Sequence, residues 1–260
     1  MIPKLITQTW KSAELPPAAR PFAESWRRHN PGMTYRLFDD AACAALIQDA
    51  FPEHLEQYQN FPYPVMRADV FRYAVIYRDG GLYADIDMEC TRPVQDLLAG
   101  AETILATEAR LTERRQAELG YPRPYQIANC VFAARPGASF FREAVDRAMA
   151  LCAARASIDR ADIEDLTGPR MLTRLFYEAQ RSDIVVLRQI ALMAPLHYPD
   201  VWPLNANIHA RHHCFGGWKA VTAKPLSRLW IERDGWPNPF PASLVDRSLA
   251  AAGAPPQGAS

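Results

Sequence analysis

The stretch between residues 65 and 87 constrains the fold more than any other part of this sequence. Apolar residues first recur there at the three- and four-residue spacing of a helix: Met66, Val70, Tyr73 and Tyr77. Asp79-Gly80-Gly81 then supplies a stop, because glycine readily adopts the left-handed backbone that ends many helices. After the glycines an alternating strand pattern follows: Leu82, Ala84 and Ile86 against Tyr83, Asp85 and Asp87. The sequence therefore predicts an amphipathic helix and then a strand that ends in two carboxylates.

The two carboxylates, Asp85 and Asp87, are separated by one residue. In an extended strand their side chains point the same way, roughly 6.8 Å apart. Two oxygen ligands on one face suit a divalent cation that keeps other positions open for phosphate oxygens. On the preceding helix, Asp69 and Arg72 share a face because they lie three residues apart, although a surface ion pair would have the same spacing. The pattern indicates metal-assisted chemistry on a diphosphate-linked substrate.

Other Asp-x-Asp proteins fit the sequence less well. An EF-hand loop beginning at Asp85 needs Gly at its sixth position and Glu at its twelfth, where this chain has Cys90 and Asp96. Phosphatases with an aspartate nucleophile resemble Asp-x-Asp-x-Thr or Asp-x-Asp-x-Val, whereas the fifth residue here is Glu89. Two alternatives stay open: a phosphohydrolase that uses the same metal pair, and a nucleotide-sugar-binding module without catalysis.

Several motifs taken together resemble glycosyltransferase family 32. They are IPKLITQTW at residues 2–10, Ser25-Trp26, Asn30-Pro31-Gly32, Ala68-Asp69-x-x-Arg72-Tyr73 and Gly80-Gly81-x-Tyr83-x-Asp85-x-Asp87. This family includes initiating mannosyltransferases, inositol-phosphoceramide mannosyltransferases and bacterial capsule or lipopolysaccharide transferases. The glucosyltransferase domain of large clostridial toxins is similar across the same stretch, including the sixteen-residue step from Asp69 to Asp85.

The resemblance is strong over residues 2–90 and patchier afterwards. Later landmarks are Asn129, Thr167-Gly168-Pro169, His212-His213 and Gly216-Gly217-Trp218. The chain departs from the family pattern at two positions, because Thr7 stands where His is common and Gly217 stands where Ser is common. The second departure removes a hydroxyl that could contact metal or phosphate.

The resemblance implies a GT-A nucleotide-sugar transferase fold, an α/β fold with a mostly parallel central sheet flanked by helices. Residues 1–249 would form one catalytic domain, with a nucleotide-sugar-binding half at 1–90 and an acceptor half with a closing loop at 91–249. The implied activity is metal-dependent, retaining transfer of a hexose from a UDP- or GDP-linked donor to a glycan, lipid-linked saccharide or glycolipid acceptor. The implied cofactor is Mn²⁺ or Mg²⁺. Residues 250–260, rich in Ala, Gly and Pro, are expected to be disordered.

The same resemblance implies roles for individual residues. Asp69, Arg72 and Asp87 would be catalytic, and Asp85, Asp87 and His213 would bind the metal. The donor would be bound by Thr9, Trp10, Asp69, Arg72, Tyr83, Asp85, Asn129 and Trp218. Trp10 would stack on the nucleotide base, with a buried core tryptophan as the alternative. Arg72 and Asp69 would hydrogen-bond hydroxyls of the donor.

Histidines 209, 212 and 213 form a second cluster of possible metal ligands. Their spacing could present a zinc face on a helix, but Phe215-Gly216-Gly217 directly afterwards favours a loop. His213 lies five residues before Trp218, where the toxin-like enzymes place a carboxylate ligand, so His213 is predicted to join Asp85 and Asp87. The alternative is a histidine that is merely hydrogen-bonded in the loop.

Charge and composition exclude other classes of protein. Lys and Arg number 29, and Asp and Glu also number 29, so no excess of charge favours a nucleic-acid partner. No run approaches the ~18 consecutive apolar residues of a membrane span. The five cysteines show no Cys-x-x-Cys spacing, and the first residues lack a signal-peptide core. The expected location is the cytoplasm, including a peripheral position at the inner membrane surface.

The rest of the sequence alternates strand and helix patterns, as a mostly parallel sheet requires. Strands are predicted at residues 4–8, 34–38, 103–107, 127–134 and 184–187. Helices are predicted at 15–28, from Asp39 or Asp40 to 50, at 52–58, 65–77 and 139–154, and from Pro169 onward.

Overall fold

The computed structural model describes residues 1–194, 196 and 206–214. Its strands are β1 (Leu5–Thr9), β2 (Thr34–Phe38), β3 (Gly81–Ala84), β4 (Met88–Cys90), β5 (Thr103–Arg110), β6 (Tyr125–Ile127), β7 (Val131–Ala134), β8 (Ile184–Leu187) and β9 (Ala210–His212). Its helices are α1 (Arg20–His29), α2 (Asp40–Ala50), α3 (Leu55–Gln59), α4 (Pro64–Asp79), α5 (Gln95–Leu98), α6 (Glu113–Leu119), α7 (Ser139–Ala153), α8 (Ile163–Leu166), α9 (Pro169–Ala179) and α10 (Gln189–Leu192). Two short 3₁₀ helices lie at Pro52–His54 and Arg160–Asp162.

Seven strands form the main sheet in the order β2-β1-β3-β7-β5-β6, with β8 paired to β5. Strand β1 runs parallel to β2 and β3, and β8 runs parallel to β5. Strand β7 is antiparallel to β3 and β5, and β6 is antiparallel to β5. The expected α/β fold with a helix-flanked central sheet is confirmed. The short strands β4 and β9 form a separate antiparallel ribbon.

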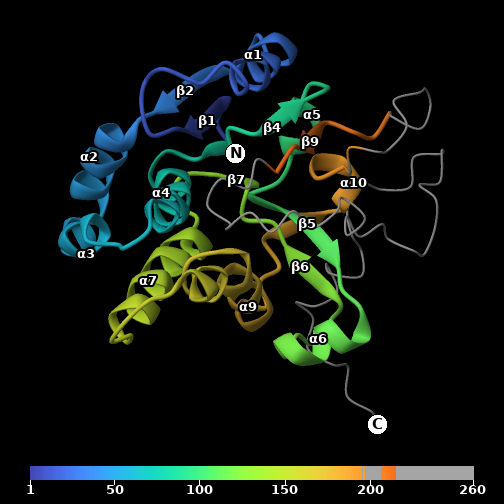
Figure 1. Cartoon of the computed structure of the whole chain (residues 1–260). Coiled ribbons are helices and arrows are strands. Elements are labelled where there is room, and N and C mark those ends of the chain that lie inside the picture. The colour runs from blue at the N-terminus through green and yellow to red at the C-terminus, as the bar shows by residue number, and fades with distance from the viewer. Residues whose placement is uncertain (195, 197–205, 215–260) are drawn as a thin grey trace.

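Helices cover both faces of this sheet (Figure 1). Alternate residues of the central strands divide between two cores: Tyr83 and Phe132 pack with α2, α4, α7 and α9, whereas Leu82 and Val131 pack with α1, α5 and α10. A strand buried on both faces reads as a continuous apolar run. The alternating pattern predicted after the glycines therefore does not separate a buried from an exposed face, since all four residues of β3 are buried.

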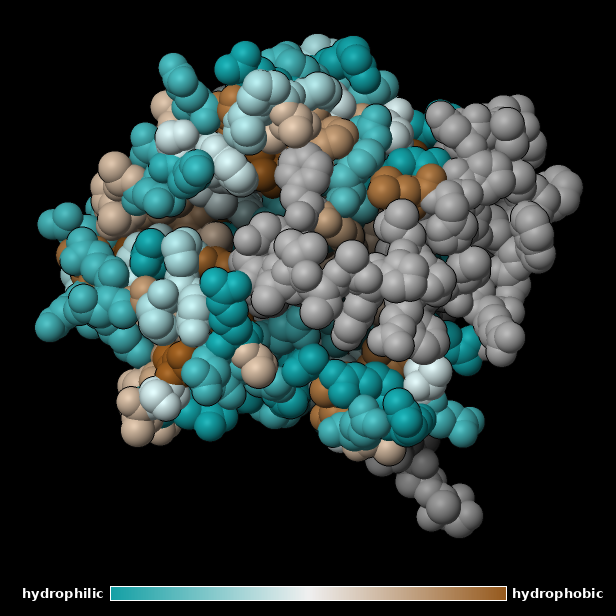
Figure 2. All heavy atoms as spheres, viewed as in Figure 1, coloured by the Kyte–Doolittle hydropathy of each residue, from teal (hydrophilic) through white to brown (hydrophobic). Residues whose placement is uncertain are grey.

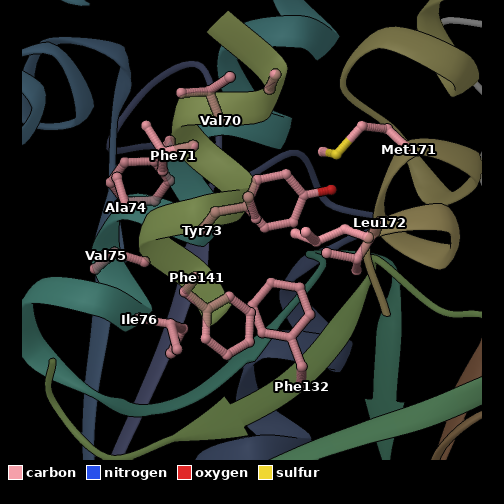
Figure 3. Close-up of a cluster of buried hydrophobic side chains, with 14 of the residues drawn as sticks. Val70, Phe71, Tyr73, Ala74, Val75, Ile76, Phe132, Phe141, Met171 and Leu172 are labelled. Atoms are coloured by element: carbon pink, nitrogen blue, oxygen red, sulfur yellow. The ribbon is translucent and has the colours of Figure 1, made fainter. Parts of the chain in front are cut away.

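Helix α4 lies inside the first of these cores (Figure 3). Every residue from 70 to 76 is buried, including Arg72. Tyr73 points toward Met171 and Leu172 of α9, and its hydroxyl donates to the carbonyl of Thr167 at 2.8 Å. The predicted helix is confirmed, but its amphipathic character is wrong, because α4 is enclosed by the sheet on one side and by α7 and α9 on the other.

The two glycines after α4 allow β3 to enter the sheet. Gly80 and Gly81 have φ angles of 66° and 90°. A Cβ on Gly80 would lie 2.8 Å from the carbonyl oxygen of Ala134, and one on Gly81 would lie 2.6 Å from that of Leu5. A side chain at either position would thus clash with a neighbouring strand, so only glycine permits this turn.

Several boundaries differ from the sequence prediction. Helix α1 begins at Arg20 instead of residue 15, because proline occupies its first turn at Pro21 and residues 16 and 17 are prolines. The strand predicted at 127–134 is two strands, β6 and β7. Strand β9 occupies part of the segment predicted as a loop. The predicted helix cap is confirmed at Asp39, whose carboxylate accepts from the amide of Ala42 at 2.8 Å.

The surface is predominantly hydrophilic on the face shown in Figure 2, with hydrophobic residues scattered over it. Met1 and Leu196 are the large hydrophobic residues exposed among those described. Within the described ranges, every helix is too short or too polar to cross a membrane.

Candidate active site

Asp85 and Asp87 lie in a turn directly after β3. The amide of Asp85 donates to the carbonyl of Cys130 at 2.8 Å, and the amide of Met88 donates back to the carbonyl of Asp85 at 3.0 Å. The side-chain amide of Gln8 also donates to that carbonyl, at 2.8 Å. The predicted extended strand through both aspartates is therefore wrong. The turn places a carboxylate oxygen of Asp85 within 4.8 Å of one of Asp87.

A third metal-ligating side chain joins the two aspartates from the ribbon. Strand β9 pairs with β4 so that His212 lies opposite Met88. The Nε2 of His212 lies 3.2 Å from Oδ1 of Asp87. One ligand atom from each of Asp85, Asp87 and His212 lies within 4.8 Å of the others. Two carboxylates and an imidazole at this spacing form a donor set that suits a divalent transition-metal ion.

His213, the predicted metal ligand, lies elsewhere. Its Nε2 lies 2.9 Å from Oε2 of Glu89, and its ring stacks on Phe22 at a centroid distance of 4.2 Å. Successive residues along an extended chain point to opposite sides. The register that directs His212 toward Asp87 therefore directs His213 away, so the structure brings His212, and not the predicted His213, to the two aspartates. His209 lies apart from both and donates from Nδ1 to the carbonyl of Pro93 at 2.6 Å.

Behind the aspartates lies a buried ionic network centred on Arg72 of α4. The guanidinium places Nη2 at 3.1 Å from Oδ1 of Asp85 and 3.4 Å from Oδ1 of Asp69. Its Nη1 donates to Oδ2 of Asp85 at 3.3 Å and to the carbonyl of Asn129 at 2.8 Å. Only 6% of the Arg72 side chain and 4% of the Asp69 side chain are exposed, whereas Asp85 keeps 23%. Asp85 is therefore the most exposed of these three side chains, and the network reaches the surface at the turn that contains it.

Two further side chains fix Asp69. The hydroxyl of Thr167 donates to Oδ2 of Asp69 at 2.8 Å, and the amide of Asn129 donates to Oδ1 at 3.0 Å. Burial raises the pKa of Asp69 to about 6, although Arg72 and the Thr167 hydroxyl favour the charged form. Burial likewise raises the pKa of Asp85, against the opposing effect of Arg72. A cation bound at Asp85 would favour its ionised form.

The other residues predicted to bind the donor differ in their burial and in their hydrogen-bond partners. Tyr83 is fully buried, and its hydroxyl donates to Oδ1 of Asp85 at 2.7 Å, so the predicted direct contact with the donor is corrected to support of Asp85. Thr9 donates its hydroxyl proton to the carbonyl of Phe38 at 2.9 Å. Trp10 is half-buried beside a small cluster that includes Ile86. Roles for Thr9 and Trp10 in donor binding stay predictions, and Trp218 lies outside the described residues.

Two residues that support the site received no role from the sequence, and a third, His212, was considered as a metal ligand but not selected. Gln8 and Thr167 belong to motifs on which the resemblance rests, but those motifs do not show which residues the two side chains hydrogen-bond. The partner of Thr167 is 98 residues away in the sequence. His212 was adjacent to the residue selected, and only the pairing of β9 with β4 distinguishes the two histidines.

One protein-family model matches the first part of this chain. Residues 16–106 match the family model described as "Glycosyltransferase sugar-binding region containing DXD motif". The matched segment contains Asp69, Arg72, Asp85 and Asp87, whereas His212 lies beyond it.

Two curated relatives are fungal enzymes. Inositol phosphoceramide mannosyltransferase 3 of Schizosaccharomyces pombe is 39% identical over 97 residues, which cover 37% of this chain and 27% of that protein. Mannosyl phosphorylinositol ceramide synthase SUR1 of Saccharomyces cerevisiae is 26% identical over 198 residues, covering 76% of this chain and 48% of that protein. The chain thus spans between about a quarter and a half of the length of these relatives.

Among solved structures, mouse xyloside xylosyltransferase 1 in its apo form shows a TM-score of 0.48 at 12% sequence identity, covering 82% of this chain and 97% of that one. A likeness this distant assigns no residue or ligand to the chain.

Proposed function

We propose that this protein is a metal-dependent glycosyltransferase, because residues 16–106 match the model of a glycosyltransferase sugar-binding region with a DXD motif. It moves a hexose from a nucleoside-diphosphate sugar to a saccharide or glycolipid acceptor. The observation that carries the proposal is the convergence of Asp85, Asp87 and His212 next to the buried guanidinium of Arg72.

Asp85, Asp87 and His212 would hold the metal ion. The three side chains are 14% to 23% exposed, so they are shielded from water without being closed off from a ligand. The bound ion would neutralise charge that develops on the leaving nucleoside diphosphate. An imidazole among the ligands favours Mn²⁺ over Mg²⁺, because Mg²⁺ is bound in proteins almost entirely through oxygen.

Arg72 and Asp69 would orient the donor sugar. Arg72 is held by two carboxylates and a carbonyl, so its position is fixed before a substrate binds. Asp69 accepts from Thr167 and Asn129 and pairs with Arg72, which makes its carboxylate a poor nucleophile. This arrangement favours a front-face substitution, in which the acceptor hydroxyl attacks on the side that the diphosphate leaves, and the anomeric configuration is retained.

The names of the curated relatives suggest the first donor to test. One is named an inositol phosphoceramide mannosyltransferase and the other a synthase of mannosyl phosphorylinositol ceramide. GDP-mannose is therefore the leading candidate donor, with UDP-hexoses as the competing class. Pocket contacts decide such specificity, and a shared motif does not.

The test is a panel assay on the purified protein. GDP-mannose, UDP-glucose and UDP-galactose are each incubated with Mn²⁺, with and without saccharide and glycolipid acceptors, and the nucleoside diphosphate and inorganic phosphate released are measured. Acceptor-dependent release of nucleoside diphosphate together with a new glycoside supports the proposal. Donor binding without release would identify a binding module, and release of inorganic phosphate would identify a phosphohydrolase. Turnover that survives complete chelation by EDTA would exclude the metal-dependent mechanism.

A further inference from the structure

The proposed metal ligands belong to two different parts of the fold. Asp85 is attached to the main sheet, because its amide donates to Cys130 next to β7 and its carbonyl accepts from Gln8 of β1. Asp87 and His212 belong to the β4–β9 ribbon, since the amide of His213 donates to the carbonyl of Asp87 at 2.9 Å and continues the ladder. The separation between Asp85 and the other two ligands therefore depends on where the ribbon is held.

Helix α1 hydrogen-bonds to the edge of β4 that does not pair with β9. The indole Nε1 of Trp26 donates to the carbonyl of Met88 at 2.8 Å. The hydroxyl of Ser25 accepts from the amide of Cys90 at 2.8 Å and donates its own proton to the carbonyl of Phe22 at 2.6 Å. Side chains of one helix thus supply the donor and the acceptor that a third strand would otherwise provide.

A third residue of α1's C-terminal end completes this contact. The side-chain amide of Asn30 donates to the carbonyl of Trp26 at 3.0 Å and lies 3.4 Å from Sγ of Cys90. Its side-chain oxygen accepts from the amide of Val94 at 2.9 Å, which anchors the chain just after β4. Ser25, Trp26 and Asn30 are buried, with at most 2% of each residue exposed. We call these three residues the α1 clamp.

We propose that the α1 clamp is a positioning element of the metal site: Ser25 and Trp26, by fixing the backbone of β4, set the distance from Asp87 and His212 to Asp85. This inference rests on the proposed metal-dependent function and assigns a role to a motif, Ser25-Trp26, that is absent from the metal and donor sites themselves. None of the clamp residues would touch the metal or the donor.

The physical reason lies in the weakness of the ribbon. A two-stranded pairing of three residues a side is marginally stable alone. Met88 directly follows Asp87, so a shift of the Met88 carbonyl moves the adjacent carboxylate with it. Residues that orient metal ligands without binding the metal typically change metal affinity by about 10–100-fold when they are mutated.

The test compares Mn²⁺ binding by the wild type, Trp26→Phe and Ser25→Ala. Mn²⁺ alone is titrated into each protein, with all of residues 1–260 present, and the free ion is measured by electron paramagnetic resonance. Trp26→Phe keeps the aromatic ring in the core but removes the indole N–H, and it is expected to weaken Mn²⁺ binding about tenfold. Ser25→Ala removes the acceptor for Cys90 and is expected to act in the same direction.

The matched control is Tyr177→Phe. The hydroxyl of Tyr177 donates to the carbonyl of Tyr125 at 2.8 Å, on the β6–α9 side of the fold. The control therefore also removes a side-chain donor from a backbone carbonyl, and it separates loss of stability from loss of ligand placement. Thermal unfolding of all variants is measured alongside, and Tyr177→Phe is expected to lower the melting temperature while leaving Mn²⁺ affinity unchanged.

The outcomes separate this inference from the proposed function. Wild-type Mn²⁺ affinity in Trp26→Phe would overturn the inference alone, because the carboxylates would then be placed without the clamp. If Trp26→Phe fails to fold, Ser25→Ala is judged by the same criterion. Absence of Mn²⁺ binding by the wild type would overturn the inference together with the metal dependence that it rests on.

Discussion

Arg72 meets the carboxylate of Asp85 with two contacts, from Nη1 to Oδ2 at 3.3 Å and from Nη2 to Oδ1 at 3.1 Å. A planar guanidinium can make such a paired contact, whereas the single ammonium of lysine cannot. The contact joins the helix before the glycine pair to the turn after β3. It fixes a positive charge directly behind the proposed metal site.

Arg72→Lys is expected to lower turnover about 100-fold, in the range seen when one preorganised donor is removed from an active site. The lysine keeps the charge but loses the paired contact with Asp85. Initial rates of nucleoside diphosphate release at saturating donor measure the effect.

Arg78→Lys is the control for this substitution. Arg78 makes a similar pair of contacts with Asp79, at 2.7 Å and 3.0 Å, but its side chain is 30% exposed. The control is expected to keep wild-type turnover. Near wild-type activity in Arg72→Lys would mean that the guanidinium stabilises the fold and does not contribute to turnover.

His212→Ala and His213→Ala are expected to behave differently, because only His212 lies with the aspartates. His212→Ala should weaken Mn²⁺ binding at least about tenfold, as expected when a ligand or its immediate support is lost. His213→Ala removes a ring stack with Phe22 and should cost about 1 kcal/mol of stability without changing Mn²⁺ affinity. If an Mn²⁺ titration instead shows weaker binding by His213→Ala and wild-type affinity in His212→Ala, His213 is the metal ligand, as the sequence predicted.

Asp87→Asn is expected to reduce turnover at least about 100-fold while leaving the fold intact, because the amide keeps the shape of the carboxylate and removes its charge. Raising the Mn²⁺ concentration should recover part of the activity. Asp49→Asn is the control, because the Asp49 side chain is 72% exposed and its contact with Arg78 is at the surface. Circular dichroism and turnover at increasing Mn²⁺ concentrations test this prediction.

Thr167→Val is expected to move the acidic side of the activity profile to higher pH. The hydroxyl of Thr167 stabilises the ionised carboxylate of Asp69, whose pKa burial raises to about 6. Without that donor the pKa rises further, so more Asp69 is protonated near neutral pH. The measurement is kcat/KM against pH for the wild type, Thr167→Val and Thr167→Ser. The serine variant keeps a hydroxyl and should restore the wild-type profile, whereas an unchanged profile in Thr167→Val would contradict the role of Thr167.

Asp69 should also make the free energy of unfolding depend on pH. Its folded-state pKa of about 6 lies above the ordinary value of 3.8, so the folded state binds the proton more tightly. The resulting stabilisation is complete below about pH 4 and is lost as the pH rises through about 6. Relative to Asp69→Asn, the wild type should therefore lose stability over that interval. Urea unfolding of both proteins across the interval measures the difference, and a constant difference would contradict the raised pKa.

The sequence by itself determined the features that depend on near neighbours. Helical spacing before Gly80, the stop at Gly80-Gly81, the cap at Asp39 and the Asp-x-Asp pair after β3 all involve residues a few positions apart. Hydrogen bonds and steric limits within such short segments are set mainly by the local residues, so the pattern is readable without the fold. The α/β alternation follows from the same local signals.

Only the tertiary structure decided which distant side chains complete the site. Asn129 and Thr167 reach Asp69 across 60 and 98 residues of sequence, and Ser25 reaches Cys90 across 65. The choice between His212 and His213 depends on how β9 pairs with β4, since a shift of one residue would exchange the directions of the two rings. Burial of α4 on all sides likewise depends on where α7 and α9 pack. These features follow from the pairing and packing of segments far apart in the chain, and local sequence patterns do not specify such contacts.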